Sequence, residues 1–225
     1  MHFLLLGSTG RTGQLVVNEL LAQGHTAVSL VRSPDKLKAR KGLTIVKGST
    51  LNRDDIEKAV TATSTPLDGC IFTLGSIRTS DSPFAAPVSP PRFMADSAAN
   101  AVSVLANHNV SRIVIQSTAG VGDSWAGFPT FLKMFMGWTN VKYTLADHNL
   151  LDAELPKTAA QYTLVRPMRI VFDTRKETQL EVLPSNGGGK LGVSNAAHLL
   201  SVAKFLVKVA VEGRYVRETI LVRDK

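Results

Sequence analysis

Short apolar runs alternate along the first half of the chain with segments whose apolar residues recur at helical spacing. Continuous apolar runs are typical of strands that are buried on both faces of a sheet. The pattern predicts strands at residues 2–6, 26–31, 43–47, 69–74 and 112–117, and helices near 11–23, 53–62 and 93–107. This alternation favours an α/β fold with a doubly wound, mostly parallel sheet.

The second half continues the pattern less regularly. It predicts a helix near 142–154 ended by Pro156, strands at 161–166 and near 178–183, a helix near 195–210 capped by Ser194, and a strand near 218–222. No internal repeat or Gly/Ser-rich linker interrupts the chain. We therefore expect residues 1–225 to form a single domain with a Rossmann-type doubly wound sheet and a small C-terminal extension on the ligand side of the sheet.

Two segments depart from this regularity. Residues 75–92 carry four prolines among small polar residues, which predicts a long loop on the carboxyl side of the sheet, where ligands bind. Residues 119–141 concentrate aromatic and methionine side chains in a chain that is only 6% aromatic. That segment is either an apolar lid over a flat substrate or a helix that packs in the core or at a dimer contact.

Composition is that of a soluble globular chain, with 44% hydrophobic and 20% charged residues. The chain enters its first strand almost at once, and no apolar run is long enough to span a bilayer. Cys70 is the single cysteine, which excludes an intramolecular disulfide and a cysteine-rich zinc site. We expect a cytoplasmic monomer or homodimer that acts on a small molecule and has no membrane partner.

The net charge of +8 raises the question of nucleic-acid binding. A basic cluster, residues 32–41, begins where the second strand ends, which is where a cofactor's adenosine ribose lies in this fold. The sequence has no RNP, KH or zinc-finger pattern. We therefore expect no nucleic-acid partner, although a phosphorylated cofactor needs only one or two of these charges.

A glycine-rich turn separates the first predicted strand from the first predicted helix. Its residues are Gly7, Ser8, Thr9, Gly10, Arg11, Thr12 and Gly13. The start of a helix offers unpaired backbone N–H groups and the positive end of the helix dipole, both of which favour an anion. Glycines let a pyrophosphate approach the backbone without meeting a Cβ atom. The turn therefore predicts a nucleotide-binding site.

The residue at the end of the second strand predicts which nucleotide is bound. Sites that prefer NAD place Asp or Glu there to bind the ribose hydroxyls, whereas this chain has Arg32 followed by Ser33. A guanidinium binds a 2′-phosphate, which a carboxylate would repel. We therefore predict NADP(H) as the cofactor, with Arg11 as a possible second contact.

The spacing G-x-x-G-x-x-G resembles that of the atypical and extended short-chain dehydrogenase/reductases. The similarity continues through residues 24–32, 113–118 and 162–167, and is closest to the NmrA-like and biliverdin reductase B-like (flavin reductase) group. It implies a Rossmann fold and an NADP-dependent oxidoreductase. The relatives carry Gly-Asp after the third strand, but here Gly48 is followed by Ser49 and Thr50, so the adenine contact differs.

The resemblance also implies which residues surround the nicotinamide. Thr118 takes the place of the serine that polarises a substrate carbonyl, and Ser117 lies beside the nicotinamide. Further cofactor contacts are implied for Thr73, Leu74 and Gly75 at the end of the fourth strand, and for Pro167, Met168 and Ile170 after the sixth.

The family's Tyr-x-x-x-Lys pair is absent, because Tyr143 is followed four residues later by Asp147. His148 stands at the lysine position and Thr144 at the tyrosine position, a departure similar to the flavin and biliverdin reductase branch. His148 is either a proton donor, a ribose or substrate contact, or a packed helix residue, and Tyr143 is the second candidate donor. The remaining histidines have no metal-ligand spacing, so we expect no metal.

These features together predict an NADPH-dependent oxidoreductase that transfers a hydride to a small aromatic, quinone- or flavin-like, or carbonyl acceptor. Two alternatives remain open at this point. An NADP-binding regulator could sense redox state without turnover, and an isomerase or cyclase could use the same pocket for non-redox chemistry.

Overall fold

The computed structural model describes residues 1–189, 191–192 and 194–225. Its main sheet contains β1 (His2–Leu6), β2 (Thr26–Val31), β3 (Leu43–Lys47), β4 (Gly69–Phe72), β5 (Arg112–Gln116), β6 (Gln161–Pro167), β8 (Leu180–Pro184) and β10 (Glu218–Asp224). The strand order is β3-β2-β1-β4-β5-β6-β10-β8. Every neighbouring pair is parallel except β10 and β8, which are antiparallel. The predicted mostly parallel sheet is confirmed.

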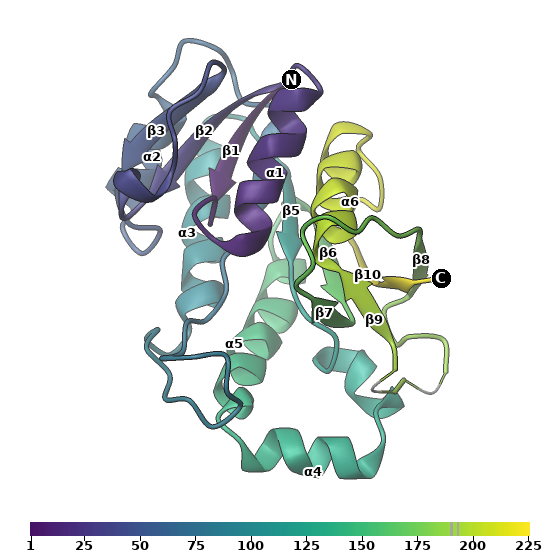
Figure 1. Ribbon diagram of the computed structural model, residues 1–225. Helices are drawn as coiled ribbons and strands as arrows, with labels where there is room; N and C mark the ends of the chain where they lie inside the picture. The colour runs from purple at the N-terminus through teal and green to yellow at the C-terminus, as the bar shows by residue number, and fades with distance from the viewer. Residues whose placement is uncertain (190, 193) are drawn as a thin grey trace.

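Helices cover both faces of this sheet (Figure 1). One layer contains α1 (Arg11–Ala22) and α6 (Leu199–Val211), and the other contains α2 (Arg53–Val60), α3 (Phe93–Asn107) and α5 (Val141–Glu154). Successive side chains of a strand point to opposite faces. In β1, Phe3 and Leu5 therefore pack with α1 and α6, whereas Leu4 and Leu6 pack with α2, α3 and α5. This two-sided burial explains why the strands read as continuous apolar runs.

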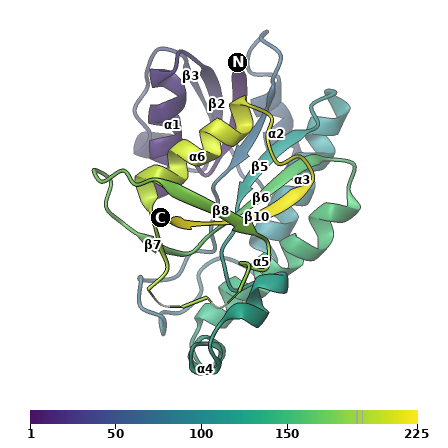
Figure 2. The same ribbon diagram turned by 90° about the vertical axis from the view of Figure 1, so that its right-hand side faces the viewer.

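The two irregular segments both lie beyond the carboxyl ends of the strands. Residues 119–141 form a short 3₁₀ helix, η2 (Gly122–Gly127), and a helix, α4 (Thr130–Trp138). Figures 1 and 2 show α4 at one end of the molecule in both views. Asn140 donates hydrogen bonds to the carbonyls of Pro83, at 2.9 Å, and Phe84, at 2.9 Å, which fix the long loop after β4 against the end of α4. Two further 3₁₀ turns are η1 (Pro34–Lys36) and η3 (Leu155–Lys157).

The prediction for the start of the last helix was wrong. Helix α6 begins at Leu199 with His198 at its N-cap, so Ser194 is not the cap. Residues Ala196–His198 are extended instead and form β9, which pairs in parallel with β7 (Arg169–Val171). The extended conformation depends on hydrogen bonding to a strand far away in the sequence, which outweighs local helix propensity.

A buried carboxylate connects α5 to the start of α3. The backbone N–H groups of Met94 and Ala95 donate to the Asp147 carboxylate at 2.9 and 3.2 Å, and the Ser76 hydroxyl donates at 3.1 Å. A negative charge at a helix N-terminus satisfies N–H groups that lack partners within the helix. Asp147 therefore holds α5, α3 and the loop after β4 in one arrangement.

Candidate functional site

The glycine turn lies between β1 and α1, as predicted. Gly7 has a φ angle of +97°, and its carbonyl accepts a hydrogen bond from the Gly10 N–H at 2.9 Å. No side chain caps α1 at Gly10, and the first turn of the helix contains no acidic residue. The N-terminus of α1 therefore leaves its first N–H groups available to an anion.

The three glycines of the turn differ in how much space surrounds the position of a Cβ atom. A Cβ atom on Gly7 would lie 2.6 Å from the Thr73 carbonyl carbon, and one on Gly13 would lie 2.1 Å from the Gly7 oxygen. At Gly10 the nearest atom would be the Gly7 oxygen at 3.2 Å. Gly7 and Gly13 are therefore required by the fold, whereas Gly10 keeps one side of the turn open. The Ser8 hydroxyl, buried without a partner among the described residues, also fits a polar ligand here.

Arg11, the first residue of α1, bridges two other segments beside this turn. Its Nη2 atom lies 2.6 Å from an Asp81 carboxylate oxygen, and its guanidinium lies 4.3 Å from the centre of the Phe172 ring. Both members of the ion pair are well exposed. Exposed ion pairs contribute little free energy, so Arg11 can exchange Asp81 for a cofactor phosphate at small cost.

The adenosine end of the site is basic or neutral. Arg32 is exposed directly after β2, with its guanidinium 5.9 Å from the centre of the Phe93 ring. After β3, the Ser49 N–H donates to Asp55 at 2.9 Å, and the Thr50 hydroxyl lies 2.8 Å from that of Ser97. The Ser49 backbone and the Thr50 side chain thus contact α2 and α3, whereas the Arg32 side chain is exposed.

The end of β4 lies directly against the glycine turn. The Thr73 N–H and hydroxyl both donate to the Leu6 carbonyl, at 2.8 and 3.3 Å. Leu74 is half-buried against the core, and Gly75 has open space where a side chain would stand. This strand end thus lies beside the turn and leaves open space at Gly75.

Two of the predicted catalytic residues form a buried pair. The Ser117 hydroxyl, at the end of β5, lies 3.2 Å from Nδ1 of His148 on α5. Ser117 and His148 are 4% and 6% exposed, so little water competes for this contact. The pKa of His148 is lowered to about 4, mainly by burial; Asp147 opposes this shift and Arg166 adds to it. The imidazole is therefore neutral at pH 7 and offers no imidazolium proton there.

Thr118 and Tyr143 lie outside this pair. The half-buried Thr118 donates its hydroxyl to the Ala119 carbonyl at 3.2 Å. Tyr143 is 52% exposed, with the Lys142 ammonium 5.2 Å from its ring centre. Thr118 thus stands next to Ser117 at the strand end, while Tyr143 faces solvent.

The segment after β6 lies beside the end of β5. The Ala119 N–H donates to the Pro167 carbonyl at 3.0 Å, and the Met168 N–H donates to Val222 at 2.9 Å. The Met168 side chain packs in a small cluster with Ala119, and Ile170 is half-buried on β7. The backbone of this segment thus borders the Ser117 and Thr118 strand end.

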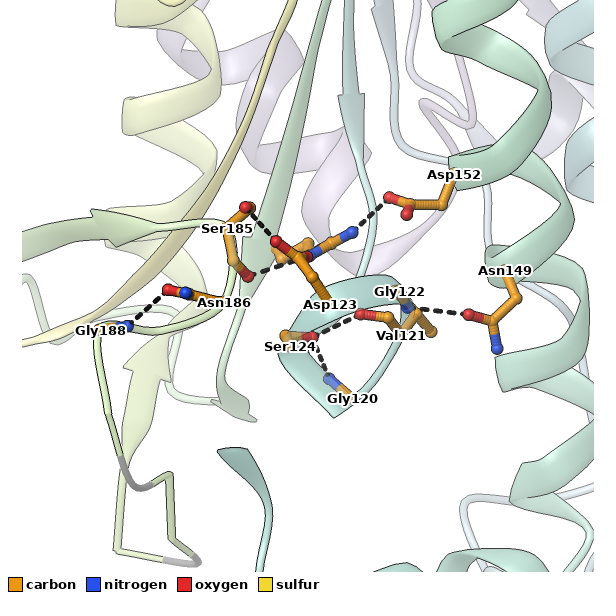
Figure 3. A network of polar contacts seen from close by, with 11 residues as sticks. Gly120, Val121, Gly122, Asp123, Ser124, Asn149, Asp152, Ser185, Asn186 and Gly188 are labelled. Atoms are coloured by element: carbon orange, nitrogen blue, oxygen red, sulfur yellow. Dashed lines mark hydrogen bonds and ion pairs between the residues drawn. The ribbon is translucent and has the colours of Figure 1, made fainter. Parts of the chain in front are cut away.

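A buried arginine that the sequence motif did not reveal organises the same edge. Arg166, at the end of β6, is 1% exposed and contacts Asp123 and Asp152, each at 2.5 Å, and the Ser185 carbonyl at 3.0 Å. Figure 3 shows Asp123, Asp152 and Ser185 converging from η2, α5 and the residue after β8. Burial opposes ionisation of Asp123, but hydrogen bonds from Ser185 and Arg166 outweigh it and lower the pKa of this carboxyl.

Two cavities flank α5 near these residues. One of about 370 Å³ lies between η2, α4 and α5 and is lined by Gly120, Trp125, Met136 and Leu145, among others. The other, of about 270 Å³, lies under the loop after β4 and is lined by Ile77, Pro87, Tyr143 and Thr144, among others. Both are mostly apolar and suit a small ring-containing molecule.

A model of the NAD(P)H-binding family matches residues 7–212, a range that includes the glycine turn, Arg32, Ser117 and His148. The chain belongs to the NAD(P)H-binding family. A comparison with curated proteins found no significant match.

Solved structures share the fold of this NAD(P)H-binding protein at low sequence identity. A short-chain dehydrogenase/reductase from Veillonella parvula DSM 2008, solved with NADP, is 19% identical with a TM-score of 0.75, covering 98% of this chain and 93% of that chain. A putative NAD-dependent epimerase/dehydratase from Bacillus halodurans is 19% identical, with a TM-score of 0.74 and coverage of 100% and 94%. ChuY, an anaerobillin reductase from Escherichia coli O157:H7, is 14% identical, with a TM-score of 0.75 and coverage of 100% and 97%.

The sequence drew attention to Ser117, Thr118 and His148 at this end of the sheet but did not reveal the Arg166 network. An arginine within an apolar strand is the signal that could have found it, because a buried guanidinium requires carboxylate partners. Among the described residues, no group of three or more histidine, cysteine or acidic side chains could hold a metal ion.

We expect Gly10→Val to abolish cofactor binding while the protein stays folded, because the added side chain blocks the open side of the turn. Gly13→Ala is the matched variant, in which even a methyl group collides with the Gly7 oxygen. It should lower the melting temperature far more than Gly10→Val does. Calorimetric titration with NADPH and thermal unfolding measure the two effects, and unchanged affinity in Gly10→Val would contradict the site.

The buried His148 predicts a specific pH dependence of stability. Because its pKa is lowered to about 4 from 6.5, the unfolded chain binds a proton at this residue that the folded chain does not. Stability should therefore fall as pH decreases through this window, by up to about 3 kcal/mol relative to His148→Gln. Urea unfolding of both proteins across the window tests this, and parallel stability curves would show that His148 is not buried in its neutral form.

Proposed function

We propose that the protein is an NADPH-dependent reductase of a small aromatic, quinone- or flavin-like, or carbonyl acceptor. The observation that carries the proposal is the exposed Arg32 after β2, where a carboxylate would stand in an NAD site. The glycine turn and the Ser117–His148 pair lie on the same edge of the sheet. The NADP complex of the Veillonella parvula protein and the description of ChuY as an anaerobillin reductase support this proposal.

Different residues of the chain would bind different parts of NADPH. The N-terminus of α1 and the open side of Gly10 would hold the pyrophosphate, and Arg32 would bind the 2′-phosphate. When bound, NADPH supplies a hydride from C4 of its nicotinamide. The strand end at Ser117 and Thr118 and the backbone of Pro167 and Met168 would orient the nicotinamide and the acceptor.

Proton delivery would not depend on a charged donor. Neutral His148 forms a hydrogen bond with the Ser117 hydroxyl. The Thr118 hydroxyl, which donates to the Ala119 carbonyl, can rotate to donate to an oxygen of the substrate instead. A quinone or flavin takes a hydride readily and can collect its proton from water. The loss of the Tyr–Lys pair is therefore compatible with reduction of such an acceptor, and supports placing the protein in the NmrA-like and biliverdin reductase B-like branch.

Arg32→Asp should weaken NADPH binding on the order of 100-fold and leave NADH binding nearly unchanged, because a charge-assisted contact is replaced by repulsion. Lys38→Asp is the matched control, since it makes the same charge change at an exposed residue of the same basic segment. Titration of both nucleotides measures the ratio. Equal losses for NADPH and NADH, or equal effects of the two variants, would mean that Arg32 does not contact the 2′-phosphate.

Turnover is tested by following NADPH oxidation against quinones, flavins and carbonyl compounds. With an activated acceptor we expect a flat pH–rate profile across neutral pH, and losses of about 10-fold in His148→Ala and Thr118→Ala. Tyr143→Phe should be fully active, because Tyr143 is 52% exposed and lies outside the Ser117–His148 pair. NADPH binding without reduction of any acceptor would favour a redox sensor. Substrate conversion without a change in nicotinamide absorbance would favour an isomerase or cyclase.

A further inference from the structure

Helix α4 carries an apolar stripe on its outer face. Phe131, Met134, Phe135 and Trp138 recur at helical spacing, and they are 63%, 70%, 43% and 78% exposed. The inner face, through Leu132 and Met136, packs on the small cluster around Met168. A helix that is apolar on both faces normally has both faces covered. The outer face of α4 is therefore an exposed apolar surface.

The loop after β4 extends this surface. The Phe84 ring lies edge-on to Phe135, at 6.5 Å between ring centres, and to Trp138, at 5.8 Å. Phe84 is 56% exposed, and Asn140 holds its carbonyl and that of Pro83 by hydrogen bonds. We call Phe84, Phe131, Met134, Phe135 and Trp138 the aromatic platform. It is built from two segments that are fixed to each other.

The two segments that carry the aromatic platform together contain basic but no acidic residues. Residues 82–91 and 124–146 contain no Asp or Glu, and their charged residues are Lys133 and Lys142. Three acidic residues border these segments. Asp81 and Asp123 are paired with arginines, and Asp147 is buried and accepts hydrogen bonds from the N-terminus of α3. The platform is thus an apolar surface with a cationic rim.

This rim distinguishes between two occupants. A second copy docked through the same surface would bring lysines toward lysines, with no carboxylate in either segment to pair with them. An anionic bilayer offers phosphates to the lysines, acyl chains to the phenylalanine and methionine side chains, and an interface that suits tryptophan. Both ribbon views place α4 at one end of the molecule, where it can meet a flat surface (Figures 1 and 2).

We propose that the aromatic platform docks this protein on the surface of an anionic lipid bilayer. None of the described helices is long and apolar enough to cross a membrane. A helix that lies in the interface needs no spanning segment, so the docking revises the expectation of no membrane partner drawn from hydropathy. The proposal does not depend on which reaction the protein catalyses.

Vesicle binding tests this proposal directly. We expect the full chain to cosediment with phosphatidylcholine vesicles that contain phosphatidylglycerol, more weakly with phosphatidylcholine alone, and less as salt is raised. In a Trp125→Phe background, Trp138 emission should shift to shorter wavelength on binding. Binding of equal strength to both vesicle types, or no binding to either, would overturn the proposal.

Paired variants connect the binding to the platform. Trp138→Ser with Met134→Gln should lower vesicle affinity at least tenfold, and Lys133→Gln with Lys142→Gln about tenfold for anionic vesicles only. Val216→Ser is the control, because Val216 is 41% exposed and lies before the amino end of β10, whereas α4 lies beyond the carboxyl ends of the strands. NADPH affinity should be unchanged in the Trp138→Ser, Met134→Gln variant, which shows that the fold is intact.

Sedimentation velocity without lipid tests whether a second copy of the chain binds to the platform instead. We expect a monomer over the concentrations used for vesicle binding. A concentration-dependent dimer that Trp138→Ser abolishes, without vesicle binding, would assign the platform to a second copy and overturn the proposal. Vesicle binding unaffected by the platform variants would overturn it as well.

Discussion

Burial of a parallel sheet on both faces is the constraint from which the rest of this structure follows. Parallel neighbours require crossover helices, and these cover the two faces with apolar side chains. Each strand interior must then be apolar, as in β1 and β5. Polar side chains that bind or react are confined to the strand ends. Because the central strands are parallel, their carboxyl ends lie together on one side of the molecule.

Charges at this edge are neutralised by partners within the protein. Arg166 is balanced by Asp123 and Asp152, and Asp147 is balanced by the N-terminus of α3. Burial keeps the His148 imidazole neutral beside these groups, so His148 contacts Ser117 through a hydrogen bond and carries no charge at pH 7.

The same edge also explains why α4 is exposed. The inner residues Leu132 and Met136 already fill the space above Met168, so the fold has no further core for the outer stripe. Moreover, Asn140 fixes α4 to the loop after β4, which places Phe84 on the outer side with the stripe. The aromatic content of residues 119–141 thus serves a small inner cluster and an outward surface.

The sequence by itself determined the strand–turn–helix at Gly7–Gly13, the order of strands and helices, and Arg32 at the end of β2. These features depend on local periodicity and on conformational rules for single residues, which the sequence displays directly. Only the tertiary structure decided that Ser117 meets His148, that Arg166 gathers Asp123 and Asp152, that residues 196–198 extend into β9, and which face of α4 is exposed. Each of these depends on segments far apart in the chain, whose contacts are set by how strands and helices pack and not by the residues next to them.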